Sequence, residues 1–533
     1  MRPEEKKYLI AAALLLVAIF LFLHFWRFPG VPNGFFYDEA SEGYNAYCIA
    51  NTGADEYGTR HPMFFVCFDN YQDPVMVYTL APLVNVFGLE KWVVRLPGAL
   101  FLLIASVAFY WLAGKYMRNR WICLGGAFMF SLLPWVFPLS RTGIGGYMPM
   151  LLGLICGWYF LADAFGRNSR RSALLAGACW AFAMYSHQIG RPMSAVILVC
   201  FVLAFNVLLI KRWRLFALFS ASIAVCLAPM TLSVINNPVS MTTRFSTIGV
   251  WNSSSGAFET VSRILSRYVD YFSPDFLFIL GDSDLRHHTG ASGELYIFML
   301  PFIIAGLYFV IKNFRRNPYC RFLIICVLAY PAAAILTMER MHSTRCLNGS
   351  PFWCMLALVG FCLLWNSFRK YRLLVIAVCC FGLVEMAAYF GNYFGAYAVK
   401  SRSSFVAPFA ETVELAFEEL GMGEKLYVSS SVFHHPVDRD FKPIWYIYFL
   451  FYGKIDPATY QRNGISESMV IPFEGKTTGA GIFIRMNSRI SVDSSGNPIA
   501  ILNNEPVPVN SKLIHNIPLS AGSDRFFEIY RVY

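Results

Sequence analysis

Residues 8–26 read YLIAAALLLVAIFLFLHFW and follow the basic residues Arg2, Lys6 and Lys7. About twenty mostly apolar residues are enough for a helix to cross a bilayer. No small-residue cleavage site follows this run, so we interpret it as a retained membrane anchor and not as a secretory signal peptide.

The rest of the chain repeats this pattern. Of its 533 residues, 56% are hydrophobic and only 14% are charged, whereas soluble domains carry about 25% charged residues. This composition excludes an ordinary water-soluble enzyme and predicts a polytopic α-helical membrane protein with about eleven transmembrane helices. The ten further apolar runs lie at 93–114, 121–139, 146–165, 172–187, 192–210, 214–235, 295–311, 321–337, 351–367 and 372–393.

The formal net charge of +11 is explained by membrane topology. Lysines and arginines gather in alternate connections between the runs, at about 115–120, 167–171, 211–214, 312–321 and 369–372. Cytoplasmic connections of membrane proteins carry such an excess. We therefore expect a multi-pass protein of the cytoplasmic membrane with its N-terminus inside, and we expect no nucleic-acid partner.

This topology predicts two domains. Residues 1–393 form the membrane domain, with outer loops at about 27–92 and 236–294, and residues 394–533 form an extracytoplasmic α/β domain. In that domain the pattern predicts a helix at 408–420 and strands at 425–429, 481–486 and 527–533. The aromatic run at 445–452, WYIYFLFY, is too short to span a membrane and is core or an interfacial patch.

The first outer loop contains a pair of acids, Asp38 and Glu39, in the stretch FYDEA directly after the first run. One interpretation is that Asp38 caps a helix that continues to about Ala50. The other is that Asp38 is a general base that takes a proton from an acceptor hydroxyl. The two interpretations are compatible, since a cap also holds the carboxylate rigidly.

Further motifs follow in order along the chain: RHP at 60–62, NYQDPV at 70–75, RLP at 95–97, LPW at 133–135, YSH at 185–187, GRP at 190–192, FSPDFLF at 272–278 and LTME at 336–339. Together they resemble the GT-C glycosyltransferases that use polyprenyl-phosphate sugars. The pattern is most similar to the bacterial branch of the protein O-mannosyltransferase and aminoarabinose lipid A transferase group. The resemblance covers about residues 30–360.

The resemblance implies a GT-C fold and sugar transfer at the outer membrane face, by single displacement with inversion. It implies that Asp38 is the base, that Glu39 orients it or the acceptor, and that Asp73 shapes the sugar site. In the aminoarabinose branch a lysine precedes the loop proline, where this chain has Asp73. A hexose donor is therefore expected.

Breaking the bond between sugar and phosphate requires cations at the leaving phosphate, and arginine suits two-pronged phosphate contacts. For each such arginine the alternative is a membrane anchor that reaches the headgroups. The expected phosphate ligands are Arg191, Arg286, Arg345 and Arg141, with His342 as a weaker candidate; the expected substrate contacts are Tyr71, His287 and His187.

We expect no required metal, because the adjacent His287 and His288 do not have a zinc-ligand spacing; a divalent ion stays an alternative. No phosphate-binding loop for ATP or a nucleotide sugar is found. The expected partners are a polyprenyl-phosphate sugar, membrane lipids and a lipid, protein or polysaccharide acceptor. The competing hypothesis is a transporter or lipid flippase without covalent chemistry, but such proteins place polar helices at the bilayer midplane, often in two similar halves.

Overall fold

A computed structural model describes residues 3–68, 70–239, 248–250, 256–367, 372–429, 432, 444–464, 470–473, 477–488, 491–492, 498–500, 507–520 and 525–533. The chain divides into two compact units. Unit 1 comprises Met1–Pro29, Asn70–Met76 and Arg95–Tyr397, and unit 2 comprises Gly30–Asp69, Val77–Val94 and Ala398–Tyr533. Two pieces of the first predicted outer loop thus belong to the same unit as the C-terminal segment.

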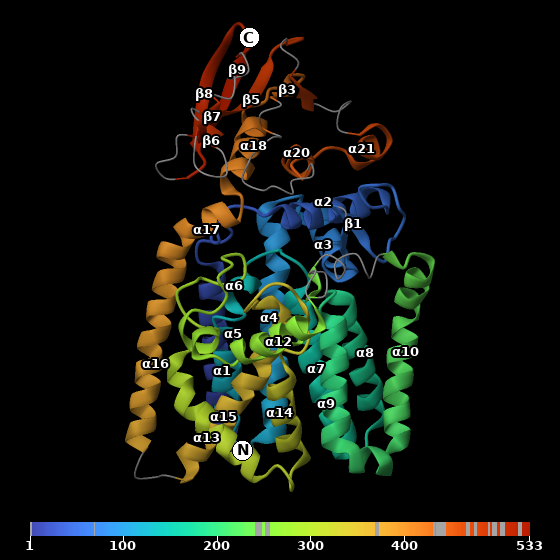
Figure 1. The fold of residues 1–533 in the computed structure, drawn as a ribbon, viewed down its shortest axis with the longest axis vertical. Coiled ribbons are helices and arrows are strands. Elements are labelled where there is room, and N and C mark those ends of the chain that lie inside the picture. The colour runs from blue at the N-terminus through green and yellow to red at the C-terminus, as the bar shows by residue number, and fades with distance from the viewer. Residues whose placement is uncertain are drawn as a thin grey trace. The chain divides into compact units, whose positions relative to one another are not determined.

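Unit 1 is a helical bundle whose long helices run side by side (Figure 1). Helix α7 packs on α8, α8 on α10, α9 on α14, and α13 on α15. Its helices are α1 (Pro3–Phe25), α4 (Lys91–Tyr116), α5 (Arg120–Ser131), α6 (Phe137–Ser140), α7 (Tyr147–Arg167), α8 (Arg170–Ser186), α9 (Gly190–Lys211), α10 (Trp213–Asn236), α12 (Ala257–Asp270), α13 (Leu300–Lys312), α14 (Pro318–Ala329), α15 (Gly349–Ser367) and α16 (Arg372–Asn392). Shorter elements are β2 (Asn70–Gln72), η2 (Asp275–Ile279), η3 (Ile297–Met299), η4 (Ala334–Leu336), η5 (Thr344–Cys346) and η7 (Tyr393–Tyr397).

Each predicted apolar run coincides with a helix or a pair of helices. Within the described residues, eight helical segments are long and apolar enough to cross a membrane. The run at 121–139 is divided between α5 and α6. Besides α6, helices α5, α8, α13 and α14 are shorter than the other helices of these runs, and α14 reaches the length of a span only with the segment that follows it to Leu336. The multi-pass helical fold is therefore confirmed, while the count of about eleven is approximate.

Two glycines allow neighbouring helices of unit 1 to approach closely. A Cβ atom on Gly146, which precedes α7, would lie 1.7 Å from the carbonyl oxygen of Ser186 at the end of α8. A Cβ atom on Gly360 in α15 would lie 1.8 Å from the carbonyl oxygen of Phe302 in α13. A side chain at either position would force these helix pairs apart.

Glu385 is an acidic residue within the apolar helix α16. Its carboxylate accepts hydrogen bonds from the backbone N–H groups of Ile297 (2.6 Å) and Phe298 (3.0 Å). These donors lie at the start of η3, where backbone N–H groups have no partner inside the helix. Glu385 therefore caps η3, and this contact satisfies a carboxylate that would be costly in an apolar environment.

Unit 2 contains a five-stranded sheet in the order β4-β3-β5-β9-β8. Strands β4 and β5 run parallel to β3, whereas β9 is antiparallel to both β5 and β8. The strands are β3 (Lys425–Val428), β4 (Val470–Pro472), β5 (Gly481–Ser488), β8 (Ser511–Pro518) and β9 (Arg525–Val532), with a ribbon of β6 (Ser491–Val492) and β7 (Pro498–Ala500). The other elements are α2 (Tyr37–Thr52), β1 (Phe65–Cys67), α17 (Ala398–Ser404), α18 (Ala407–Glu419), α20 (Tyr446–Tyr452) and α21 (Pro457–Asn463), and α3 (Pro74–Phe87) lies mostly in this unit.

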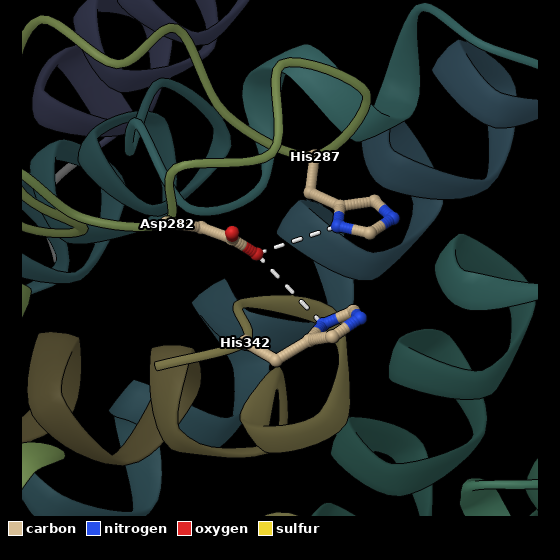
Figure 2. A group of neighbouring side chains, drawn as sticks. All are labelled: Asp282, His287 and His342. Atoms are coloured by element: carbon tan, nitrogen blue, oxygen red, sulfur yellow. Dashed lines mark hydrogen bonds and ion pairs between the residues drawn. The ribbon is translucent and has the colours of Figure 1, made fainter. Parts of the chain in front are cut away.

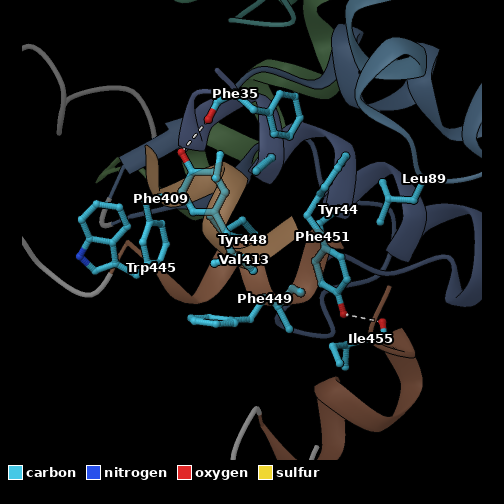
Figure 3. Packing of buried hydrophobic residues seen from close by; sticks show 14 of the residues in the cluster. Phe35, Tyr44, Leu89, Phe409, Val413, Trp445, Tyr448, Phe449, Phe451 and Ile455 are labelled. Atoms are coloured by element: carbon cyan, nitrogen blue, oxygen red, sulfur yellow. Dashed lines mark hydrogen bonds between the residues drawn. The ribbon is translucent and has the colours of Figure 1, made fainter. Parts of the chain in front are cut away.

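The aromatic run at 445–452 forms α20 and lies in the core of unit 2 (Figure 3). The ring of Trp445 packs edge-on against Phe409 of α18 at 4.1 Å between centroids. The Tyr448 hydroxyl donates a 2.7 Å hydrogen bond to the carbonyl oxygen of Phe35, two residues before the start of α2. Helix α20 thus joins α2 to α18, and of the two interpretations of this run the core is the correct one.

Candidate functional site

Asp38 lies in the first turn of α2, and its neighbour Glu39 fixes the start of that helix. The N-cap is Phe36, which has extended backbone angles (φ −74°, ψ 148°). The backbone N–H of Phe36 donates to Glu39 Oε2 at 2.9 Å, and Glu39 is fully buried. The interpretation of Asp38 as the N-cap residue is therefore wrong. Asp38 is half-buried in the first turn, where the helix dipole favours a negative charge.

The helix face that carries Asp38 also carries Glu42 and Asn45, four and seven residues further on. The buried thiol of Cys67 lies near these groups: burial raises its pKa, and the negative charges of Asp38, Glu56 and Glu42 raise it further. The carboxyl group of Glu56 accepts hydrogen bonds from Tyr446 (3.0 Å) and Asn45 (3.3 Å). Because burial dominates, the pKa of Glu56 rises to about 8.

These contacts place the half-buried Asp38 at the start of a helix beside buried, hydrogen-bonded polar groups. A carboxylate in this position is suited to accept a proton from a bound hydroxyl group.

Asp73 and Arg191 form a buried ion pair in unit 1. Asp73 directly precedes α3, Arg191 is the second residue of α9, and Arg191 Nη2 donates to Asp73 Oδ1. Their side chains are only 7% and 10% exposed. Burial raises the pKa of Asp73 to about 6, although the positive charge of Arg191 and a backbone hydrogen bond from Gln188 act to lower it. A predicted phosphate ligand is thus paired with a predicted sugar-site acid.

Two predicted substrate contacts also lie in unit 1. The ring of His187 packs on Tyr147 at 4.3 Å between centroids, and its Nδ1 accepts the backbone N–H of Ile189 at 3.2 Å. His187 and Arg191 therefore flank the same turn between α8 and α9. The hydroxyl of Tyr71 accepts a 3.2 Å hydrogen bond from the side-chain amide of Asn237.

A second cluster in unit 1 is centred on Asp282 and joins two loops (Figure 2). Asp282 Oδ2 lies 3.3 Å from His287 Nδ1 and 3.8 Å from His342 Nδ1, and it accepts the backbone N–H of Ser343 at 2.8 Å. The two imidazole rings are 4.6 Å apart. Burial acts to raise the pKa of Asp282, but the hydrogen bond from His287 and the charges of both histidines bring it below its usual value.

Glu294 supports this cluster by hydrogen bonds, and no sequence motif singles it out. Its Oε1 accepts hydrogen bonds from the backbone N–H of Asp282 (3.2 Å) and from the hydroxyl of Ser343. The side chain is fully buried, and burial raises its pKa well above the usual value. No recognisable motif spacing links Glu294 to the other acids of its loop, Asp282 and Asp284, so the sequence carries no signal that identifies it.

The cluster brings together four of the predicted residues. Arg286 forms a two-pronged ion pair with Asp284, with 2.5 Å from Nη2 to Oδ2, and its side chain is about one-third exposed. Glu339 accepts from Arg345 Nη2 at 2.5 Å and from His342 Nε2 at 3.0 Å. Arg286 and His287 thus come from one loop, and His342 and Arg345 from the other.

Arg141 has a different environment. It is fully buried and donates to the backbone carbonyl oxygens of Leu23 (2.8 Å), His24 (2.5 Å) and Trp26 (2.9 Å). These carbonyl groups lie at the C-terminal end of α1, where they have no partner inside the helix. The contacts of Arg141 are those of a helix cap.

One group of described residues has the chemistry to hold a metal ion. Ligand atoms of Asp282, His287 and His342 lie within 4.8 Å of one another. Two imidazole nitrogens and a carboxylate oxygen form a donor set that zinc and related ions accept. The same atoms also interact directly with one another, and the expectation that no metal is required stays a prediction.

Comparison with known proteins gives a match of part of the chain to a family model, and a match of the whole chain in fold. Residues 70–232 match the family model described as dolichyl-phosphate-mannose-protein mannosyltransferase. No curated protein sequence matches the chain. The structure is similar to ArnT from Cupriavidus metallidurans bound to undecaprenyl phosphate, with a TM-score of 0.54 and 13% identity over 99% of this chain and 98% of that chain. The apo state of ArnT from the same organism gives 0.55 and 15% identity over 98% of each chain.

Proposed function

Because this chain is a membrane protein of the GT-C glycosyltransferase fold, as its resemblance predicted, we propose that it transfers a hexose from a polyprenyl-phosphate carrier to an acceptor hydroxyl, with Asp38 as general base. The carrier is supported by the similarity to ArnT, which was solved with undecaprenyl phosphate. The hexose is supported by the match to a mannosyltransferase family model and by Asp73 at the place of the aminoarabinose-branch lysine.

The observation that carries the proposal is the position of Asp38. It lies in the first turn of α2, which Glu39 fixes by accepting the N–H of Phe36. In the proposed reaction, Asp38 takes the proton of the acceptor hydroxyl while the acceptor oxygen attacks C1 of the sugar. The bond from C1 to the phosphate oxygen breaks, its electron pair leaves with the polyprenyl phosphate, and the configuration at C1 is inverted.

The leaving phosphate gains negative charge, and three arginines of unit 1 are proposed to stabilise it. Arg191, Arg286 and Arg345 are each held by a carboxylate, namely Asp73, Asp284 and Glu339. Such a carboxylate orients the guanidinium group before a phosphate binds, which lowers the entropic cost of binding. Arg141 is left out of this set, because its side chain is fully buried against the backbone carbonyl groups at the end of α1.

No metal takes part in the proposed step. The leaving group is a single phosphate, so a few guanidinium groups can balance the charge that it gains. The acceptor is a lipid, a protein or a polysaccharide, and the donor is bound from the predicted outer leaflet.

The test is sugar transfer in membrane vesicles that contain wild-type protein, Asp38→Asn, or Glu90→Gln as a matched control. Glu90 is an acid of the same unit whose side chain is 45% exposed. Each vesicle preparation receives a panel of radiolabelled undecaprenyl-phosphate hexoses, with undecaprenyl-phosphate aminoarabinose for comparison, and both free carrier and labelled product are measured.

We expect Asp38→Asn to lose about 10²- to 10⁴-fold in rate, with normal insertion and with the control unchanged. A rate within threefold of wild type would overturn the assignment of Asp38. Carrier movement across the vesicle without sugar transfer would favour the flippase hypothesis instead.

A further inference from the structure

Helix α12 of unit 1 is strongly amphipathic, and its apolar face is exposed. Its sequence, AFETVSRILSRYVD, places Phe258, Val261, Leu265 and Val269 on one side at helical spacing. These side chains are 89%, 55%, 61% and 67% exposed. A continuous apolar stripe of this kind is too exposed for a surface that faces water.

The opposite, polar face of α12 is the one that attaches to the protein. Arg267 is 9% exposed and donates to the backbone carbonyl oxygens of Thr337 and Met338, the latter at 2.6 Å. Helices on the surface of water-soluble proteins bury the apolar face and expose the polar one. The reversed arrangement of α12 means that its outer face meets an apolar environment.

The apolar stripe continues a surface that faces lipid. The Tyr268 hydroxyl donates a 2.9 Å hydrogen bond to the carbonyl oxygen of Leu328, near the end of α14. Leu328 belongs to a segment that is long and apolar enough to cross a membrane, and it is itself 51% exposed. Because α12 is anchored beside an exposed residue of a membrane span, lipid is the occupant that best fits the stripe.

The flank of α12 has the charge expected at headgroup level. Arg263, Arg267 and Arg340 line an open groove together with Glu259 and Asp270. Arg340 is paired with Asp270 at 2.6 and 2.7 Å, and Arg263 with Glu259 at 3.0 Å. The arginines outnumber the acids along this groove, and a helix with a cationic flank and an apolar face binds in the interfacial layer of a bilayer.

We infer that α12 is an interfacial lipid-binding helix. Its apolar stripe lies among the upper acyl chains of the bilayer, and the groove beside it, with Arg263 and with Arg340 from a neighbouring loop, faces phospholipid headgroups. Tyr271 is the next residue after α12, and its side-chain hydroxyl oxygen accepts a hydrogen bond from the backbone N–H of His342 at 3.1 Å. Lipid contact at α12 therefore holds the loops of the Asp282 cluster near headgroup depth, and this inference does not depend on the proposed reaction.

Photocrosslinking of the full-length chain in vesicles tests this inference. The photoreactive amino acid p-benzoylphenylalanine replaces Leu265 on the apolar stripe or, as a control, Met422, a fully exposed residue of unit 2. Val261 gives a second position on the stripe if the Leu265 variant does not fold. The vesicles contain radiolabelled phosphatidylcholine and phosphatidylglycerol.

We expect at least fivefold more labelled lipid on the Leu265 or Val261 variant than on the Met422 variant. Equal labelling at the stripe and at Met422 would overturn the inference. So would crosslinking of the stripe to a protein, whether a second copy or another chain, in place of lipid.

Discussion

Removing Arg191 from its ion pair with Asp73 should destabilise the protein in a pH-dependent way. The pKa of Asp73 is about 6 in the folded chain against an ordinary value of 3.8. One pKa unit corresponds to about 1.4 kcal/mol, so the charged carboxylate is about 3 kcal/mol less favourable in the folded than in the unfolded state. The burial of Asp73 causes this penalty, and Arg191 keeps it from being larger.

The sign of the pH dependence follows from proton binding. Between pH 4 and pH 6 the folded chain holds the Asp73 proton more tightly than the unfolded chain, so this group lowers the stability as the pH rises. In Arg191→Gln the pKa of Asp73 rises further, because the neighbouring positive charge is lost. At pH 5 Asp73 is mostly protonated, and the substitution costs only a hydrogen bond of about 1 kcal/mol.

At pH 8 the Arg191→Gln variant loses additional free energy of unfolding, and this loss has an upper limit. Asp73 can take up a proton instead of remaining charged and unpaired, and raising its pKa from about 6 to the solution pH costs at most about 3 kcal/mol. We therefore expect the Arg191→Gln substitution to lower the free energy of unfolding by up to about 3 kcal/mol more at pH 8 than at pH 5. The assay is denaturant unfolding of purified protein in nanodiscs at both pH values.

The matched control is the double variant Asp73→Asn, Arg191→Gln, which lacks the titrating carboxyl. Its stability difference from Asp73→Asn alone should be the same at pH 5 and pH 8. An equal loss for Arg191→Gln at the two pH values would refute the reasoning, since the effect would then not pass through Asp73.

Three further predictions concern packing and metal. Arg141→Gln should lower the free energy of unfolding by about 3 kcal/mol, because charged hydrogen bonds to the end of α1 are lost. Unchanged stability together with a raised KM for the sugar donor would contradict this and would indicate that Arg141 binds the donor phosphate. Gly146→Ala should cost more than about 2 kcal/mol in a thermal unfolding assay, since its Cβ would lie 1.7 Å from the carbonyl oxygen of Ser186; an unchanged melting temperature would contradict this. Chelation with EDTA should leave sugar transfer unchanged. A loss that one divalent metal restores would contradict this and would make Asp282, His287 and His342 the first site to test by substitution.

The membrane helices could be predicted because their signal is local. A run of about twenty apolar residues is costly outside lipid or a protein core, whatever the rest of the chain does. The same holds for the helix α18 and for strands β3, β5 and β9, which follow the period of their apolar residues. Hydropathy predicts one span at 121–139, because it does not detect the break between α5 and α6.

The candidate site was predictable only in part. The acids after the first span and the arginines between later spans stand out in sequence because polar residues are rare beside apolar runs. The sequence did not indicate that Arg141 caps α1, or that Glu294 supports Asp282, because each contact joins residues that are distant along the chain or lack a recognisable spacing.

By itself the sequence determined that this is a multi-pass helical membrane protein with acids directly after its first span, since hydropathy and charge act locally on each segment. The tertiary structure decided which charges meet. It paired Asp73 with Arg191 across 118 residues, and it placed two histidines from separate loops on one carboxylate. The physical reason is that a buried charge needs a partner, and which partner it finds depends on how the helices pack.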